Sequence, residues 1–176
     1  MILKGFKQNS TKKSLEAMLH ARQVLLNDDK IKSLGVVLHI DEMNDFKAFE
    51  KLAEALHVKP NNLKIISFTS NNKNKKNAVA EAFFSAKDFG WKGKVKNEEL
   101  QAFINQPFDA LISFYQEDIL ELKFITAASQ AKFKIGILQS DNRINDLIIK
   151  TELKDVELFQ SETIKYLNIF NKINNE

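Results

Sequence analysis

The sequence predicts an α/β fold in which a mostly parallel sheet lies between two layers of helices. Short segments rich in Val, Ile and Leu alternate along the chain with longer segments whose apolar residues recur at helical spacing. The short segments are almost continuously apolar, as expected for strands that are covered on both faces. Alternation of this kind predicts a three-layer, Rossmann-like sandwich with flanking helices and an N-terminal amphipathic helix.

Four short apolar segments carry the strand signal, and the clearest of them is rich in Val and Leu. The predicted strands are residues 33–40, 63–69, 109–114 and 133–138, with residues 146–151 as a further candidate. Residues 78–84 fit a short helix or an extra strand. In either case we expect the aromatic side chains of this region to be buried, namely those of Phe83, Phe84, Phe89 and Trp91.

Five segments carry a helical apolar stripe. The first runs from about Ser10 to Asn27, with Ser10 or Thr11 as its N-cap, and packs on the domain. The others are residues 46–57, 97–105, 118–130 and 157–173, and residues 174–176 are expected to fray.

Length and composition indicate one domain over residues 1–176, since single cores commonly span about 100–200 residues. The chain has no cysteine, which excludes disulfides, thiolate metal sites and cysteine nucleophiles, and a reducing cytoplasm is the natural setting. No apolar run approaches the roughly 18 residues of a membrane span, and no signal peptide is evident at the N-terminus.

Positive charge is concentrated in the middle of the chain. Residues 59–97 carry nine lysines against two acidic residues, whereas the following segment is acidic. Lysines could neutralise phosphates and an aromatic ring could stack on bases, which makes this segment the best nucleic-acid candidate. Readers of base sequence usually use arginine, and the chain has only two, so nucleic-acid binding is the weakest of our functional hypotheses. Its residues would be Lys73, Lys75, Lys76, Trp91, Lys92 and Lys94.

Polar side chains follow the predicted strands, at the edge where open parallel sheets bind ligands. If they converge, they offer carboxylates, hydroxyls and one arginine to a small anionic or glycosyl ligand. Polar residues after strands are also what helix N-caps require, so the pattern has a purely structural interpretation. The candidate ligand-binding residues are Asp41, Thr69, Ser113, Tyr115, Asp141 and Arg143.

Motifs of the common enzyme and nucleotide-binding classes are missing from the sequence. It contains no glycine-rich phosphate loop, no G-x-S-x-G nucleophile elbow and no H-E-x-x-H pair. The three histidines lie on three different elements, so we expect no metal site and no cofactor. His39, near the end of a predicted buried strand, is expected to be a hydrogen-bonded core residue.

Four stretches of the chain carry a resemblance to a known family: Lys12-Lys13-Ser14-Leu15 and residues 109–115, 125–136 and 145–149. They resemble an uncharacterised family of short bacterial α/β proteins. The resemblance spans nearly the whole chain and implies no catalytic residue. The order of strand, Ala-Ala-Ser helix and Lys-Ile-Gly strand is also faintly similar to one half of nucleotide-sugar glycosyltransferases, a likeness of fold alone.

The leading functional hypothesis is a binding protein without catalysis of its own, whose partner is a protein, a second copy of the chain or a small anionic ligand. The alternative is an enzyme with a nonstandard site at the strand ends, acting on a phosphorylated or glycosyl substrate. Asp41, Ser113, Tyr115, Asp141 and Arg143 would form that site.

Overall fold

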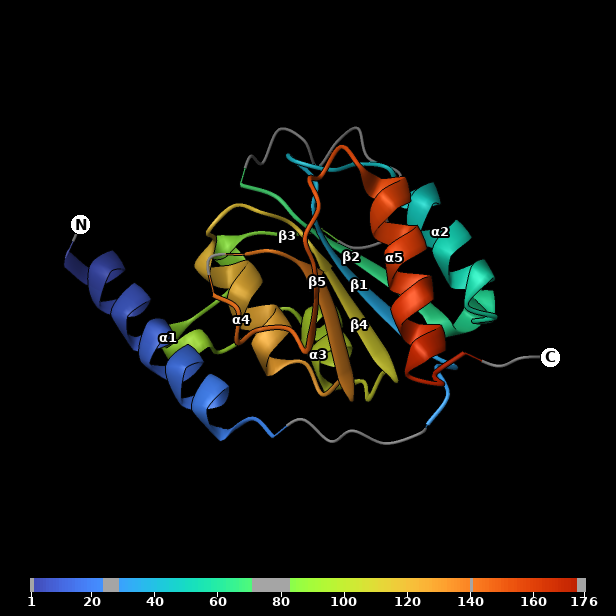
Figure 1. Cartoon of the computed structure of the whole chain (residues 1–176). Coiled ribbons are helices and arrows are strands. Elements are labelled where there is room, and N and C mark those ends of the chain that lie inside the picture. Colours follow the sequence, from blue (N-terminus) through green and yellow to red (C-terminus); the bar gives the residue numbers. More distant parts are fainter. Residues whose placement is uncertain (1, 24–28, 71–82, 140, 174–176) are drawn as a thin grey trace.

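A computed structural model describes residues 2–23, 29–70, 83–139 and 141–173 (Figure 1). The strands are β1 (Leu34–His39), β2 (Leu63–Phe68), β3 (Phe83–Phe84), β4 (Ala110–Phe114), β5 (Phe133–Ile137) and β6 (Leu147–Ile149). The helices are α1 (Ile2–Ala21), α2 (Phe46–Ala55), α3 (Glu98–Asn105), α4 (Leu120–Ala128) and α5 (Val156–Ile169), with 3-10 turns η1 (Pro60–Asn62), η3 (Ala86–Asp88) and η4 (Trp91–Gly93). All six strands are parallel and lie in the order β3-β2-β1-β4-β5-β6. The predicted α/β class with a parallel sheet is confirmed.

Two hydrophobic cores lie on opposite faces of the sheet. In Figure 1, α2 and α5 cover one face, while α1, α3 and α4 lie on the other. Adjacent residues of a strand point to opposite faces, so Val36 packs in the core under α2 and α5 and Val37 in the other. Every residue of β1, β4 and β5 is buried, which explains why these strands lack polar alternation.

The N-terminal helix begins earlier and ends earlier than the sequence predicts. It starts at Ile2, and the Ser10 and Thr11 hydroxyls donate to the carbonyl of Lys7 at 2.8 and 3.1 Å. This bonding to the preceding turn places both residues inside the helix, so the prediction that they form the N-cap is wrong. The predicted apolar stripe is present, because Leu15 and Leu19 are buried. The predicted end, at Asn27, lies outside the described residues.

The other predicted elements are present with small shifts at their ends. The Asp45 carboxylate caps α2 by accepting from the amide of Ala48, and Asn97 caps α3 in the same way. The ambiguous segment 78–84 contains β3, and its first five residues are outside the described part of the chain, as is the tail at 174–176.

Trp91 departs from the expectation of burial, because its side chain is 54% exposed while Phe84 and Phe89 are buried. The backbone reverses directly after it, at Lys92 and Gly93, which have φ values of 55° and 75°. This turn directs Trp91 outward. A Cβ at residue 93 would lie 2.1 Å from the ring of Phe124, so only glycine fits both the conformation and the space.

The strand order places a topological switch point between β1 and β4. From β1 the chain continues to β2 and β3 on one side, and then returns to β4, β5 and β6 on the other. The loops that leave the carboxyl ends of β1 and β4 therefore diverge, which is where open α/β sheets bind ligands. The last residue of β1 is His39.

Candidate functional site

His39 lies at this switch point, completely buried and surrounded by carboxylates. Its Nε2 atom is 3.3 Å from an Asp41 oxygen, and its Nδ1 atom is 3.3 Å from Glu42 and 3.8 Å from Glu117. Neither ring nitrogen makes a hydrogen bond with any described group. The expectation of a hydrogen-bonded core histidine is therefore only half met: the side chain is buried, but its polar atoms are unsatisfied.

Glu42 is fixed in place by the loop that follows β4. Its two carboxylate oxygens accept hydrogen bonds from the amides of Gln116 and Glu117, at 3.0 and 2.9 Å. These bonds connect the end of β1 to the end of β4 across the switch point. They also hold Glu117 beside His39, although the Glu117 side chain is 59% exposed.

Asp41 is held from the opposite side, by the end of β2. The Thr69 hydroxyl donates to the Asp41 carboxylate at 3.2 Å, and the Ser70 amide donates to it at 2.9 Å. The predicted convergence of Asp41 and Thr69 is therefore present in the structure. Together with His39, Glu42 and Glu117, they bring residues from the ends of three strands to one place.

The arrangement has the chemistry of a cation site. A neutral imidazole carries one N–H group and one nitrogen lone pair, yet both ring nitrogens of His39 face carboxylate oxygens. A lone pair facing a carboxylate is repulsive, and either a proton on that nitrogen or a metal ion between the two groups removes the repulsion. Ligand atoms of His39, Glu42 and Glu117 all lie within 4.8 Å of one another, close enough to share one metal ion. No other such group of three occurs among the described residues.

Asp41 completes the pattern found around metal-bound histidines. A histidine that binds a metal through one nitrogen usually donates its other N–H to a carboxylate or carbonyl, which fixes the ring and its tautomer. With Nδ1 facing Glu42 and Glu117, Nε2 faces Asp41. If a metal ion were bound to Nδ1 beside the two glutamates, Asp41 would lie where it could accept a hydrogen bond from Nε2.

Ser113 and Tyr115, also predicted for the site, instead belong to a buried polar network around the end of β4. The Ser113 hydroxyl donates to Asn145 at 2.9 Å, Gln139 donates to Ser113 at 3.3 Å, and the Tyr115 hydroxyl bonds to Thr126 at 2.8 Å. Burial raises the pKa of Tyr115 above its ordinary value. Both hydroxyls have partners inside the fold, so a role in supporting β4 and β5 accounts for them.

Asp141 and Arg143 form a separate surface group with α1. The Arg143 guanidinium donates to Asp141 at 2.6 Å and to both oxygens of Glu16 at 3.1 Å. The hydrogen bond to Arg143 lowers the pKa of Asp141, and that to Asp141 raises the pKa of Arg143. No described contact joins these residues to Asp41, so the six predicted residues divide into three groups.

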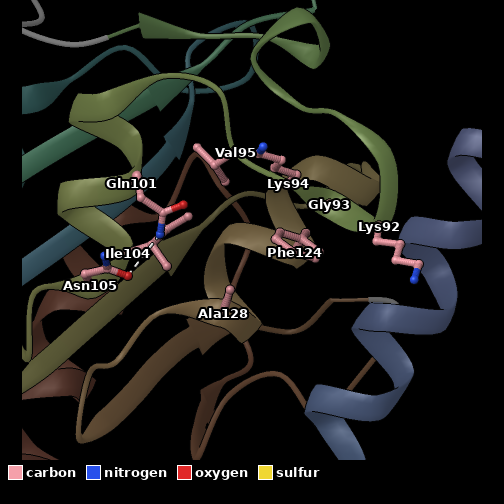
Figure 2. A pocket seen from close by; sticks show the side chains of 9 residues that line it. All are labelled: Lys92, Gly93, Lys94, Val95, Gln101, Ile104, Asn105, Phe124 and Ala128. Atoms are coloured by element: carbon pink, nitrogen blue, oxygen red, sulfur yellow. Dashed lines mark hydrogen bonds between the residues drawn. The ribbon is translucent and has the colours of Figure 1, made fainter.

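The predicted basic segment borders an open pocket of about 330 Å³ between η4, α3 and α4 (Figure 2). Val95, Ile104, Phe124 and Ala128 give it an apolar lining, and its polar lining residues include Gln101 and Asn105. Figure 2 shows Lys92 pointing away from the pocket. Trp91, Lys92 and Lys94 are exposed, as nucleic-acid contacts would have to be. Lys73, Lys75 and Lys76 lie outside the described residues, and nucleic-acid binding stays a prediction.

Glu42 and Glu117 belong to the polar residues that follow the predicted strands, but they are not among the six candidate ligand-binding residues, and His39 was expected in the core. The available signal was a histidine that ends a buried strand and is followed directly by Asp41-Glu42. Its importance depends on the strand order, which places β4 and its Glu117 next to β1. The sequence alone does not give the strand order, so it does not indicate which later acidic residue lies near His39.

Residues 7–170 match the model of a family of unknown function, DUF6913. The chain belongs to this family. The predicted resemblance to an uncharacterised family is thus confirmed, and the matched residues include all six strands as well as His39, Glu42 and Glu117. The search of curated proteins found no match. Among the described residues, no helix is long and apolar enough to cross a membrane.

Proposed function

We propose that this DUF6913 protein binds a divalent metal ion through His39, Glu42 and Glu117, and that its function depends on that ion. The observation that carries the proposal is the buried imidazole, whose two nitrogens face carboxylates without making a hydrogen bond. A buried polar group without a partner costs about 1–3 kcal/mol, and a bound cation would remove that cost. The proposal departs from our sequence-based expectation of no metal site.

The donor set favours particular metals. Two carboxylates and one imidazole suit Mn²⁺, Fe²⁺ and Zn²⁺, whereas Mg²⁺ and Ca²⁺ prefer oxygen ligands alone. Three protein ligands leave further coordination positions for water or another ligand. Because the Glu117 side chain is largely exposed, those positions would be open to solvent.

Charge limits what else can bind here. Glu42 and Glu117 supply two carboxylates, and no lysine or arginine among the described residues forms an ion pair with either of them. A divalent ion would neutralise these two negative charges. We infer that the small anionic ligand expected from the sequence would bind at this edge only through the metal.

An open metal site also supports the alternative of an enzyme. Structural metal sites usually have all positions filled by protein, while catalytic sites keep one for water or substrate. The exposure of Glu117 favours the second type. Metal-bound water is a hydrolytic nucleophile near neutral pH, so metal-dependent hydrolysis is the reaction class to test first.

Isothermal titration calorimetry with Mn²⁺ and Zn²⁺, on protein first treated with a chelator, tests the proposal. We expect binding of one ion, and weaker binding at acidic pH because protons compete for the ligand atoms. Glu117→Gln should weaken binding by about tenfold or more, and its exposed position leaves the fold intact. Glu50→Gln, an exposed carboxylate change on α2, is the matched control and should have no effect.

Two results of the titration would contradict the proposal. If neither ion binds, or if Glu117→Gln and Glu50→Gln behave alike, the proposed function is wrong. The polar cluster would then serve only to hold the ends of β1 and β4 together.

A further inference from the structure

Helix α5 carries a stripe of four residues that lies outside its buried face, three of them exposed and one partly exposed. The stripe consists of Leu158, Glu162, Lys165 and Ile169, which are four, three and four residues apart and therefore share one face of the helix. Leu158 is 48% exposed and Ile169 is 66% exposed, so two large apolar side chains face solvent. The buried face, with Phe159, Thr163 and Leu167, packs on the sheet.

The stripe is complementary to itself under a two-fold rotation. Its apolar residues stand at the two ends, and the charged pair Glu162 and Lys165 stands in the middle. The stripe is symmetric about the midpoint between Thr163 and Ile164. An antiparallel copy of α5 would therefore set Leu158 against the partner's Ile169 and Glu162 against the partner's Lys165, and each contact would occur twice.

We propose that two copies of this chain associate through α5, about a two-fold axis near residues 163 and 164. Each of the four stripe residues then meets a residue of matching chemistry, as the isologous interface of a symmetric dimer requires. The outer pairs lie about 8 Å along the helix from the axis, since each residue rises about 1.5 Å. A crossing angle near 20°, common for packed helices, keeps them in contact.

Charge is the reason to favour a second copy over another protein. A glutamate and a lysine on one stripe give no net charge, so neither an acidic nor a basic partner is selected. The Lys165 ammonium already lies 3.0 and 2.9 Å from the Glu162 oxygens within the helix. In the dimer the two pairs would form one network of four alternating charges, shielded by the leucines and isoleucines on either side.

The size of the surface indicates a weak dimer. Figure 1 shows α5 beside α2 on the outer side of the sheet, where a partner molecule can approach it. The helix has 14 residues, fewer than the roughly 20–30 per partner found in stable interfaces of standard size. We therefore expect association in the micromolar range rather than a permanent dimer.

Charge reversal gives the sharpest test, because the two middle residues exchange roles across the axis. In sedimentation velocity over a concentration series, Glu162→Lys should weaken the dimer about tenfold or more, since residue 162 would then meet the partner's Lys165. Lys165→Glu should do the same for the opposite reason. The double variant with both changes should regain the dimer. Glu99→Lys makes the same charge change on α3, across the sheet, and serves as the control.

Cysteine cross-linking provides a second readout, because the chain has no cysteine of its own. A mixture of the Leu158→Cys and Ile169→Cys variants should form a disulfide-linked pair faster than either variant alone. A wild-type protein that stays monomeric at every concentration would overturn the proposal. A dimer that the single charge reversals do not weaken would also overturn it, and would place the interface elsewhere.

Discussion

Lys134 on β5 should make the free energy of unfolding of the protein rise as the pH increases above about 7. Its side chain is buried, with its residue only 2% exposed, and its ammonium donates to the carbonyl of Ala127 at 2.9 Å. The charged groups that face it are Arg22, from the end of α1, and Asp146, which accepts from both the Arg22 guanidinium and the Lys134 amide. Burial, assisted by the positive charge of Arg22, lowers the pKa of Lys134 to about 7.

The magnitude follows from the difference between the folded and unfolded pKa values. In the unfolded chain the lysine titrates near its ordinary value of 10.5, so between pH 7 and that value the unfolded state holds more protons. The free energy of unfolding therefore increases as the pH rises. Each pKa unit corresponds to about 1.4 kcal/mol, which gives about 5 kcal/mol over the full range and about 3 kcal/mol between pH 7 and 9.5.

Urea unfolding followed by circular dichroism at several pH values measures this slope. Lys134→Met keeps the length of the side chain and removes the charge, so the variant should lose most of the pH dependence. Lys132→Met is the control: the hydrogen bond to Asp109 raises the pKa of Lys132, which places its titration above the measured range. If wild-type protein and Lys134→Met show the same slope, the lysine is charged in the folded state and the reasoning is refuted.

Two further changes test the packing. Phe159→Ala should lower the free energy of unfolding by about 3–5 kcal/mol, because the Phe159 ring is fully buried and packs edge-on against Phe114, with ring centroids 4.8 Å apart. Phe170→Ala, at a 42% exposed position, should lower it by about 1 kcal/mol or less in the same urea titration. Gly136→Ala should cost about 1–3 kcal/mol because its Cβ would lie 2.3 Å from an Asn145 side-chain nitrogen. Gly5→Ala, with open space around it in α1, should instead raise the melting temperature, and equal effects of the two glycine changes would contradict the packing described.

The layers of the fold were predictable because each depends on local patterns. The continuous apolar run from Leu34 to Leu38 is a strand covered on both faces, and Asp45 and Asn97 cap helices as short-range chemistry indicates. The start of α1 was predicted wrongly because the side chains of Ser10 and Thr11 can make either of two local hydrogen bonds. Their hydroxyls can cap a helix or bond back to the preceding turn, and the sequence does not distinguish these.

Of the predicted site, the structure contains only the contact between residues that follow two adjacent strands. Asp41 and Thr69 follow β1 and β2, which are adjacent, and their hydrogen bond is the part of the predicted cluster that the structure contains. Arg143 instead binds Glu16, which is 127 residues away in the sequence. That contact depends on where α1 lies against the sheet, and no local pattern encodes it.

The most direct test of the metal proposal is a crystal structure of the protein grown or soaked with Mn²⁺, with anomalous diffraction data. We predict a single strong anomalous peak within about 2.0–2.3 Å of His39 Nδ1 and of one oxygen each from Glu42 and Glu117, with Asp41 hydrogen-bonded to Nε2. A map without a peak at the ends of β1 and β4, at a manganese concentration that saturates ordinary sites, would contradict the account.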